Sequence, residues 1–156
     1  MGYIAREIGL VPAGPFFRDR HFQAALWAGV GFWLALGLFV PVQPIALWQV
    51  ASWSFILLTI WYPWFEETIF RGFLQGQLHA FAWGQYAWLG LSLANVITSI
   101  VFVLGHFWRH SPLWALAVIA PSLVLGYFRD RYQSVYPSIF LHMFYNAGYF
   151  GLTGLP

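Results

Sequence analysis

The chain has 156 residues, of which 60% are hydrophobic, 22% aromatic and only 8% charged. A soluble domain of this length cannot bury so many apolar side chains, so the composition excludes an ordinary soluble enzyme and indicates that lipid surrounds the chain. Cysteine is absent, which excludes disulfides and thiolate nucleophiles, and the seven basic residues form no cluster dense enough to bind nucleic acid.

Residues 1–21 contain several charges and two prolines, and we expect an interfacial N-terminal arm there. Apolar segments follow, most of them close to the roughly twenty residues that cross a bilayer, at about 22–40, 45–79, 85–107, 113–128 and 135–152. The second is too long for one straight span, and Pro63 is expected to kink it or to let the chain reverse. The sequence therefore predicts an all-α integral membrane protein, with residues 22–156 forming one domain of five transmembrane helices, or six.

The stretch WFEETIFRGF at residues 64–73 places three charged side chains in an apolar segment. Ionisable groups at membrane depth cost a few kcal/mol each, so they are expected to face a cavity and to find partners. Glu67 and Arg71 are four residues apart and can pair on one helical face, whereas Glu66 lies on an adjoining face. Gly72 and Gly76 on the same helix would let a neighbouring helix approach closely.

Polar residues also share helical faces in two later segments. In the third segment the spacings of four, three and four align Asn95, Ser99, Phe102 and His106. In the fifth segment His142 and Asn146 are four residues apart and project together. We therefore expect three helices to present polar faces to a shared interior.

Two carboxylates, two imidazoles and a carboxamide can supply a general base, an acid and oxyanion donors for hydrolysis by an activated water. No G-x-S-x-G turn or H-E-x-x-H helix occurs, so neither a covalent nucleophile nor a metal or other cofactor is predicted. Two alternatives stay open. One is a non-catalytic immunity factor or scaffold with a structural ion pair, and the other is a zinc protease with Glu66, His106 and His142 as scattered ligands.

Three motifs in order resemble those of a known family. EETIFRG at 66–72, FVLGH at 102–106 and HMFYN at 142–146 resemble the E-E-x-x-x-R, F-x-x-x-H and H-x-x-x-N motifs of the CAAX-protease and bacteriocin-processing family. This family consists of glutamic intramembrane proteases. The resemblance covers about residues 50–152 and is to a short bacterial member.

The resemblance implies a role for each motif residue. Glu66 and His106 would hold and activate a water, Glu67 and Arg71 would shape and balance the site, and His142 with Asn146 would stabilise the oxyanion. We expect Phe102 and Asn95 to shape the site by packing.

The expected function is cleavage of a membrane-anchored protein or peptide near its C-terminus. Members of the family trim CAAX-type C-termini, act in bacteriocin maturation or immunity, or resemble enzymes that process C-terminal sorting signals. The lack of a cytosolic domain favours the last group, in a bacterial cell membrane that the chain crosses several times.

The distribution of arginines favours five crossings over six. With five crossings and a cytoplasmic N-terminus, only Arg109 lies outside, and the site opens toward the outer half of the membrane. With six crossings, Arg129 and Arg131 move to the side opposite the N-terminus.

Overall fold

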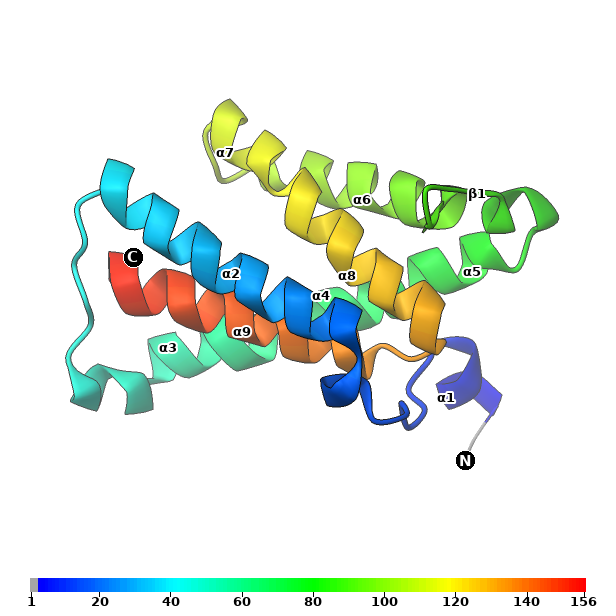
Figure 1. The fold of residues 1–156 in the computed structure, drawn as a ribbon, viewed down its shortest axis with the longest axis horizontal. Helices are drawn as coiled ribbons and strands as arrows, with labels where there is room; N and C mark the ends of the chain where they lie inside the picture. The colour runs from blue at the N-terminus through cyan, green and yellow to red at the C-terminus, as the bar shows by residue number, and fades with distance from the viewer. Residues whose placement is uncertain (1–2) are drawn as a thin grey trace. The chain divides into compact units, whose positions relative to one another are not determined.

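A computed structural model describes residues 3–156, whose regular secondary structure is helical apart from one short hairpin (Figure 1). The elements up to the middle of the chain are α1 (Tyr3–Glu7), η1 (Phe16–Arg18), α2 (Arg20–Phe39), η2 (Leu47–Ala51), α3 (Trp53–Ile56), η3 (Leu57–Trp61), α4 (Tyr62–Glu67), η4 (Thr68–Gln75) and α5 (Gly76–His79). The remaining elements are η5 (Ala82–Gln85), β1 (Ala87–Trp88), β2 (Leu91–Ser92), α6 (Leu93–His106), α7 (Pro112–Ala117), α8 (Ile119–Tyr132) and α9 (Tyr136–Thr153).

The chain divides into two compact units. Unit 1 consists of Met1–Gly14 and Glu66–Ser138, and unit 2 of Pro15–Phe65 and Ile139–Pro156. The chain thus passes from unit 2 into unit 1 within α4, directly before Glu66, and returns to unit 2 within α9. The predicted arm of residues 1–21 is divided between the two units.

Unit 1 is built around α6 and α8, which pack along one another (Figure 1). The Ser92 hydroxyl begins α6 by accepting a hydrogen bond from the Asn95 N–H at 3.0 Å, as an N-cap does. At the same end of the pair, Gln133 ends α8 in the left-handed conformation with φ of 50°. The apolar core of the unit comprises Ala94, Phe102, Val103, Ala115, Leu125, Phe128 and Val135.

Unit 2 joins α2 to the part of α9 that follows Ser138. The Tyr145 hydroxyl donates to the Ala25 carbonyl at 3.0 Å, and the Trp33 indole lies so close to Gly148 that a Cβ atom there would overlap it. The opposite side of α2 leaves large apolar side chains exposed, with Trp27 at 73% and Leu38 at 80%. Such a surface suits contact with lipid.

Two helices within residues 3–156 are long and apolar enough to cross a membrane, Arg20–Phe39 and Pro112–Tyr132. The all-α class is confirmed apart from one short hairpin, whereas the bundle of five spans stays a prediction.

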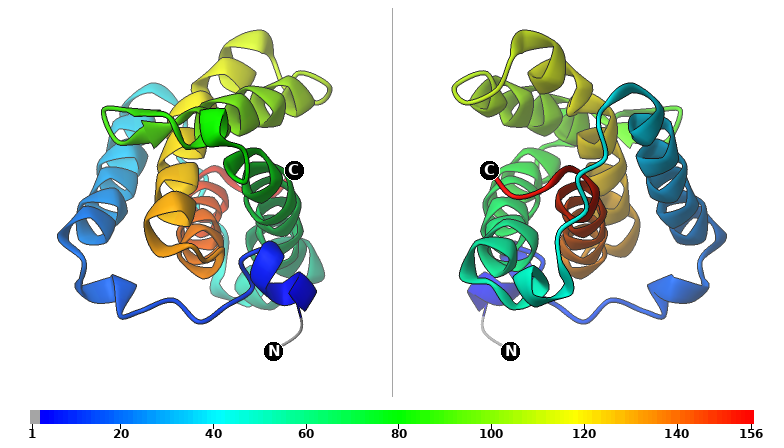
Figure 2. Two further views of the ribbon diagram at one scale, coloured as in Figure 1. Left: turned by 90° about the vertical axis from the view of Figure 1, so that its right-hand side faces the viewer. Right: turned by 90° about the vertical axis from the view of Figure 1, so that its left-hand side faces the viewer.

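The structure corrects the predicted start of the third segment. Instead of a helix from about residue 85, a two-stranded antiparallel hairpin pairs Ala87 with Ser92 and Trp88 with Leu91, and α6 begins only at Leu93 (Figure 2). The two loop residues, Leu89 and Gly90, both have positive φ, at 51° and 82°. Two such residues form a tight hairpin turn, which ends any helix.

The second segment also differs from a simple kinked span. Residues 53–79 are continuously helical, but they include two π-helical stretches, η3 and η4. Pro63 lies between these stretches in α4, and the residues from 47 to 51 form a separate 3₁₀ turn. We refer to residues 53–79 as the motif helix.

Candidate active site

The three charges of the motif helix lie at the point where α4 continues into the π-helical stretch η4. Glu67 and Arg71 are both fully buried, and Arg71 Nε lies 3.2 Å from Glu67 Oε2. The pairing predicted from their spacing is therefore confirmed. Glu66 is half-buried, and its carboxylate also attracts the Arg71 guanidinium electrostatically.

Arg71 takes its other partners from α6 and α8. Its Nη2 donates to both the carbonyl oxygen of Ser122 at 2.9 Å and the Ser122 hydroxyl at 2.7 Å. Its guanidinium carbon lies over the Phe102 ring, 4.6 Å from the centroid. A buried charge is tolerated only with such close partners, so these contacts fix Arg71 relative to α6 and α8.

His106, the last residue of α6, is half-buried. Its Nδ1 lies 2.9 Å from the Phe102 carbonyl oxygen. Because a carbonyl can only accept, Nδ1 must hold the proton in this contact, so a neutral His106 has its basic lone pair on Nε2. That nitrogen can accept a hydrogen bond from a bound water.

Phe102 connects the first and second motifs inside unit 1. Besides the Arg71 guanidinium, its ring contacts the His106 imidazole, with centroids 4.5 Å apart. Phe70 of the motif helix packs edge-on against the same ring at 4.9 Å. Phe102 is 3% exposed, so its position is set by packing on all sides.

Asn95 and Ser99 join α6 to α8. The Asn95 amide Nδ2 donates to the Leu123 carbonyl at 2.9 Å, and its Oδ1 accepts from the Ser99 hydroxyl at 3.1 Å. A Cβ atom on Gly126 would overlap the Asn95 amide, so the close approach of the two helices requires glycine there. The predicted polar face of α6 thus begins with helix-packing contacts and ends at His106.

Several polar residues of this network were not predicted from the sequence. Gln75 donates to the Gly126 carbonyl at 2.9 Å and to Asp130 Oδ1 at 2.7 Å, and Ser92 donates to Asp130 Oδ2 at 2.5 Å. Gln75 follows Arg71 by four residues, and this spacing predicts that the two side chains share a helical face. Ser122 lies in an apolar segment, and Asp130 lies in the charged stretch RDRYQS, which has the composition of a surface turn. The pattern around these two residues therefore did not predict a contact with the site.

The third motif lies in unit 2. His142 is half-buried in α9, and the Asn146 amide Nδ2 donates to the Leu58 carbonyl in η3 at 2.9 Å. Unit 1 alone therefore contains Glu66, Glu67, Arg71, Asn95, Phe102 and His106. The meeting of His142 and Asn146 with those residues stays a prediction.

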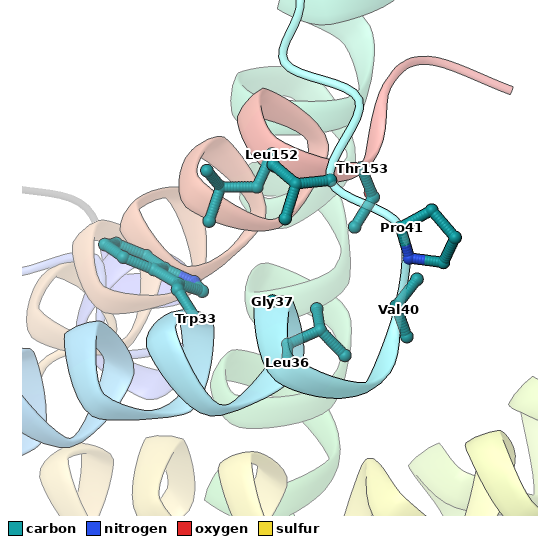
Figure 3. Close-up of a pocket in the computed structure, with 8 residues that line it drawn as sticks. Trp33, Leu36, Gly37, Val40, Pro41, Leu152 and Thr153 are labelled. Atoms are coloured by element: carbon teal, nitrogen blue, oxygen red, sulfur yellow. The ribbon is translucent and has the colours of Figure 1, made fainter.

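Over residues 3–156, no group of three or more histidine, aspartate or glutamate side chains is arranged to hold a metal ion. A small pocket in unit 2 lies between the C-terminal ends of α2 and α9, where Trp33, Leu36 and Leu152 line it (Figure 3). Its lining is mainly apolar and includes none of the predicted site residues, so it is not a candidate for the chemistry.

The motif region of the chain matches a known protein-family model. The family model described as Type II CAAX prenyl endopeptidase Rce1-like matches residues 46–148, which include all three motifs. No curated protein and no solved structure matches the chain.

Proposed function

The chain belongs to the Rce1-like family of type II CAAX prenyl endopeptidases, and on that premise we propose that it is a glutamic intramembrane endopeptidase. Membership makes it a membrane-embedded protease in general terms. The proposal adds the catalytic type, the roles of individual residues and the kind of substrate.

In the proposed reaction, Glu66 and His106 hold a water, and Glu66 accepts a proton from it. The resulting hydroxide adds to the carbonyl carbon of the scissile peptide bond, and the C–N bond breaks when the amine takes up a proton. Arg71 and Glu67 balance the charge beside the water. General acid–base help of this kind accelerates a reaction by about 10²–10⁴-fold.

His142 and Asn146 are proposed to stabilise the oxyanion. An imidazole N–H and an amide N–H are both suitable donors to the negative oxygen of the tetrahedral intermediate. In the structure the Asn146 amide donates one hydrogen bond to the Leu58 carbonyl, which leaves its second N–H for this role.

The proposed substrate is a membrane-anchored protein or peptide that is cut near its C-terminus. The family description names a CAAX prenyl endopeptidase. A prenylated CAAX end and a C-terminal sorting signal share the general form of a short segment next to a membrane anchor. An apolar, membrane-embedded enzyme meets such a segment by diffusion within the bilayer.

The observation that supports this function best is the position of Phe102. Its ring contacts the Arg71 guanidinium of the first motif and the His106 imidazole of the second, at 4.6 and 4.5 Å. The two motifs that are assigned to the water therefore meet within one unit.

His106→Ala tests the assignment in proteoliposomes with a fluorogenic prenylated peptide that ends in a CAAX tetrapeptide. We expect kcat to fall by about a hundredfold or more, because one of the two groups that hold and activate the water is lost. The exposed His21 provides the control, and His21→Ala should cleave the peptide like the wild type. Equal rates for both variants would remove His106 from the mechanism.

A further inference from the structure

Arg129 is buried although it belongs to the charged stretch RDRYQS, which has the composition of a surface turn. Arg129 is only 6% exposed, whereas Arg131, two positions later, is exposed. A buried guanidinium needs hydrogen-bond acceptors. Arg129 Nε donates to the backbone carbonyl of Arg71 at 3.0 Å, the same residue whose side chain pairs with Glu67.

The N-terminal arm lies against the same place. Gly9 has φ of +70°, and a Cβ atom there would lie 2.8 Å from Arg129 Cζ. A Cβ atom on Gly72 would lie 2.8 Å from the Ile8 carbonyl oxygen. The close approach that Gly72 permits is therefore to the backbone of the arm, and not to a neighbouring transmembrane helix as its spacing suggested.

Backbone hydrogen bonds hold the arm in that position. The Gly9 carbonyl accepts from the Val135 N–H at 2.9 Å, and the Val11 carbonyl accepts from the Ser134 hydroxyl at 2.7 Å. These donors lie in the connection between α8 and α9. The arm is thus fastened on one side to this connection and contacts the motif helix on the other.

We propose that Arg129 is a positioning residue, and that Arg129, Gly9 and Gly72 form a clamp that sets the place of Glu66, Glu67 and Arg71 in the active site. The clamp acts through the Arg71 carbonyl and through contact of the arm with η4. It rests on the proposed function, since it concerns the same catalytic glutamate.

The physical reason lies in the π-helical form of η4. A π-helical stretch is rare, seldom extends beyond a single turn within an α-helix, and is frequent at functional sites. The Arg129 hydrogen bond fixes this stretch one turn after Glu67. A shift of about 1 Å in a reacting group can cost about a hundredfold in rate, so a residue that never touches substrate can control kcat.

Two variants with matched controls test the clamp. Arg129→Lys keeps the positive charge but has no N–H at the position of Nε, and the control is Arg131→Lys on the same helix. Gly9→Ala leaves Arg129 unchanged but pushes its guanidinium away from the Arg71 carbonyl, and the control is Gly14→Ala, where no atom lies within 4 Å of the new methyl group.

The measurements are kcat and KM for the fluorogenic prenylated CAAX peptide in proteoliposomes, and amide hydrogen exchange over residues 5–11 and 68–76. We expect both clamp variants to lower kcat by about tenfold or more while KM changes less than about twofold. Exchange should become faster in both segments. The two controls should match the wild type in all of these values.

Wild-type kcat and exchange in Arg129→Lys and Gly9→Ala would overturn the clamp. A lower kcat with unchanged exchange in residues 68–76 would also overturn it, because the motif helix would then not have moved. The failure of the proposed function looks different: Glu66→Gln would cleave normally, while the exchange changes of the clamp variants would persist. Amide hydrogen exchange does not depend on activity, so it tests whether the motif helix has moved even in a variant that cleaves the peptide slowly.

Discussion

The Arg71 guanidinium is closed off from solvent and takes its partners from three elements, with Glu67 in its own helix, Phe102 on α6 and Ser122 on α8. Removing one member of a buried ion pair leaves the other charge without compensation, which costs far more than the pair itself contributes. The pair is therefore expected to matter for folding as well as for the electrostatics of the site.

A double-mutant cycle measures this coupling. Glu67→Gln and Arg71→Gln should each lower the free energy of unfolding in detergent micelles by about 3–5 kcal/mol, because each leaves one buried charge. The double variant removes both charges and should lose less than the sum of the two. A coupling below about 0.5 kcal/mol would mean that the pair is not coupled in the folded protein.

At the scale of single residues, the spacing of residues predicted side-chain contacts within one helix but did not predict contacts between helices. The Glu67–Arg71 contact follows from a separation of four residues, which brings side chains together on any α-helix. The bonds from Arg71 to Ser122 and from Gln75 to Asp130 join positions 51 and 55 residues apart. The sequence pattern around Arg71 or Gln75 does not identify a partner so far away in the chain.

At the scale of elements, the helices of the N- and C-terminal segments were predicted closely. For α2, Asp19 accepts a hydrogen bond from the His21 N–H at 2.7 Å at its start, and Pro41 follows its end, so familiar signals define it. The hairpin before α6 was missed because its turn is Leu89–Gly90, and leucine rarely adopts positive φ. The π-helical stretches η3 and η4 were not predicted, because π-helices are rare and occur mostly as short interruptions of an α-helix.

The contact between α6 and α8 yields a prediction at Gly126. Gly126→Ala places a methyl group where the Asn95 amide lies, so the helices must separate or the bond from Asn95 to Leu123 must break. We expect a loss of about 1–3 kcal/mol in the free energy of unfolding. Gly31→Ala on α2, where the methyl group meets open space, is the control and should be neutral or slightly stabilising. A neutral Gly126→Ala would show that the interface is looser than this packing implies.

At the scale of the whole molecule, the contacts within unit 1 bear on the number of crossings. The arm bonds to Ser134 and Val135 directly after α8, and Ser92 at the start of α6 bonds to Asp130 near the end of α8. The arm, the start of α6 and the end of α8 therefore lie at one end of unit 1. Six crossings would place the arm and Arg129 on opposite sides of the membrane, so these contacts support our proposal of five.

Fusion of a reporter that is active only in the cytoplasm tests the proposal. With five crossings and a cytoplasmic N-terminus, a reporter after Pro156 should be inactive, and the same reporter fused before Met1 should be active. Cytoplasmic activity at Pro156 would indicate six crossings. In that case the site would open toward the cytoplasm, and an exported substrate would no longer be expected.

The central claim, that Glu66 activates the attacking water, is tested most directly by Glu66→Gln. The amide is nearly the same size as the carboxylate but cannot accept a proton from water, so the variant should fold normally in proteoliposomes. We expect it to cleave the fluorogenic prenylated CAAX peptide at least about a hundredfold more slowly than the wild type. Glu7→Gln, which changes an exposed glutamate of α1, should retain the wild-type rate. Cleavage by Glu66→Gln at the wild-type rate would contradict the account.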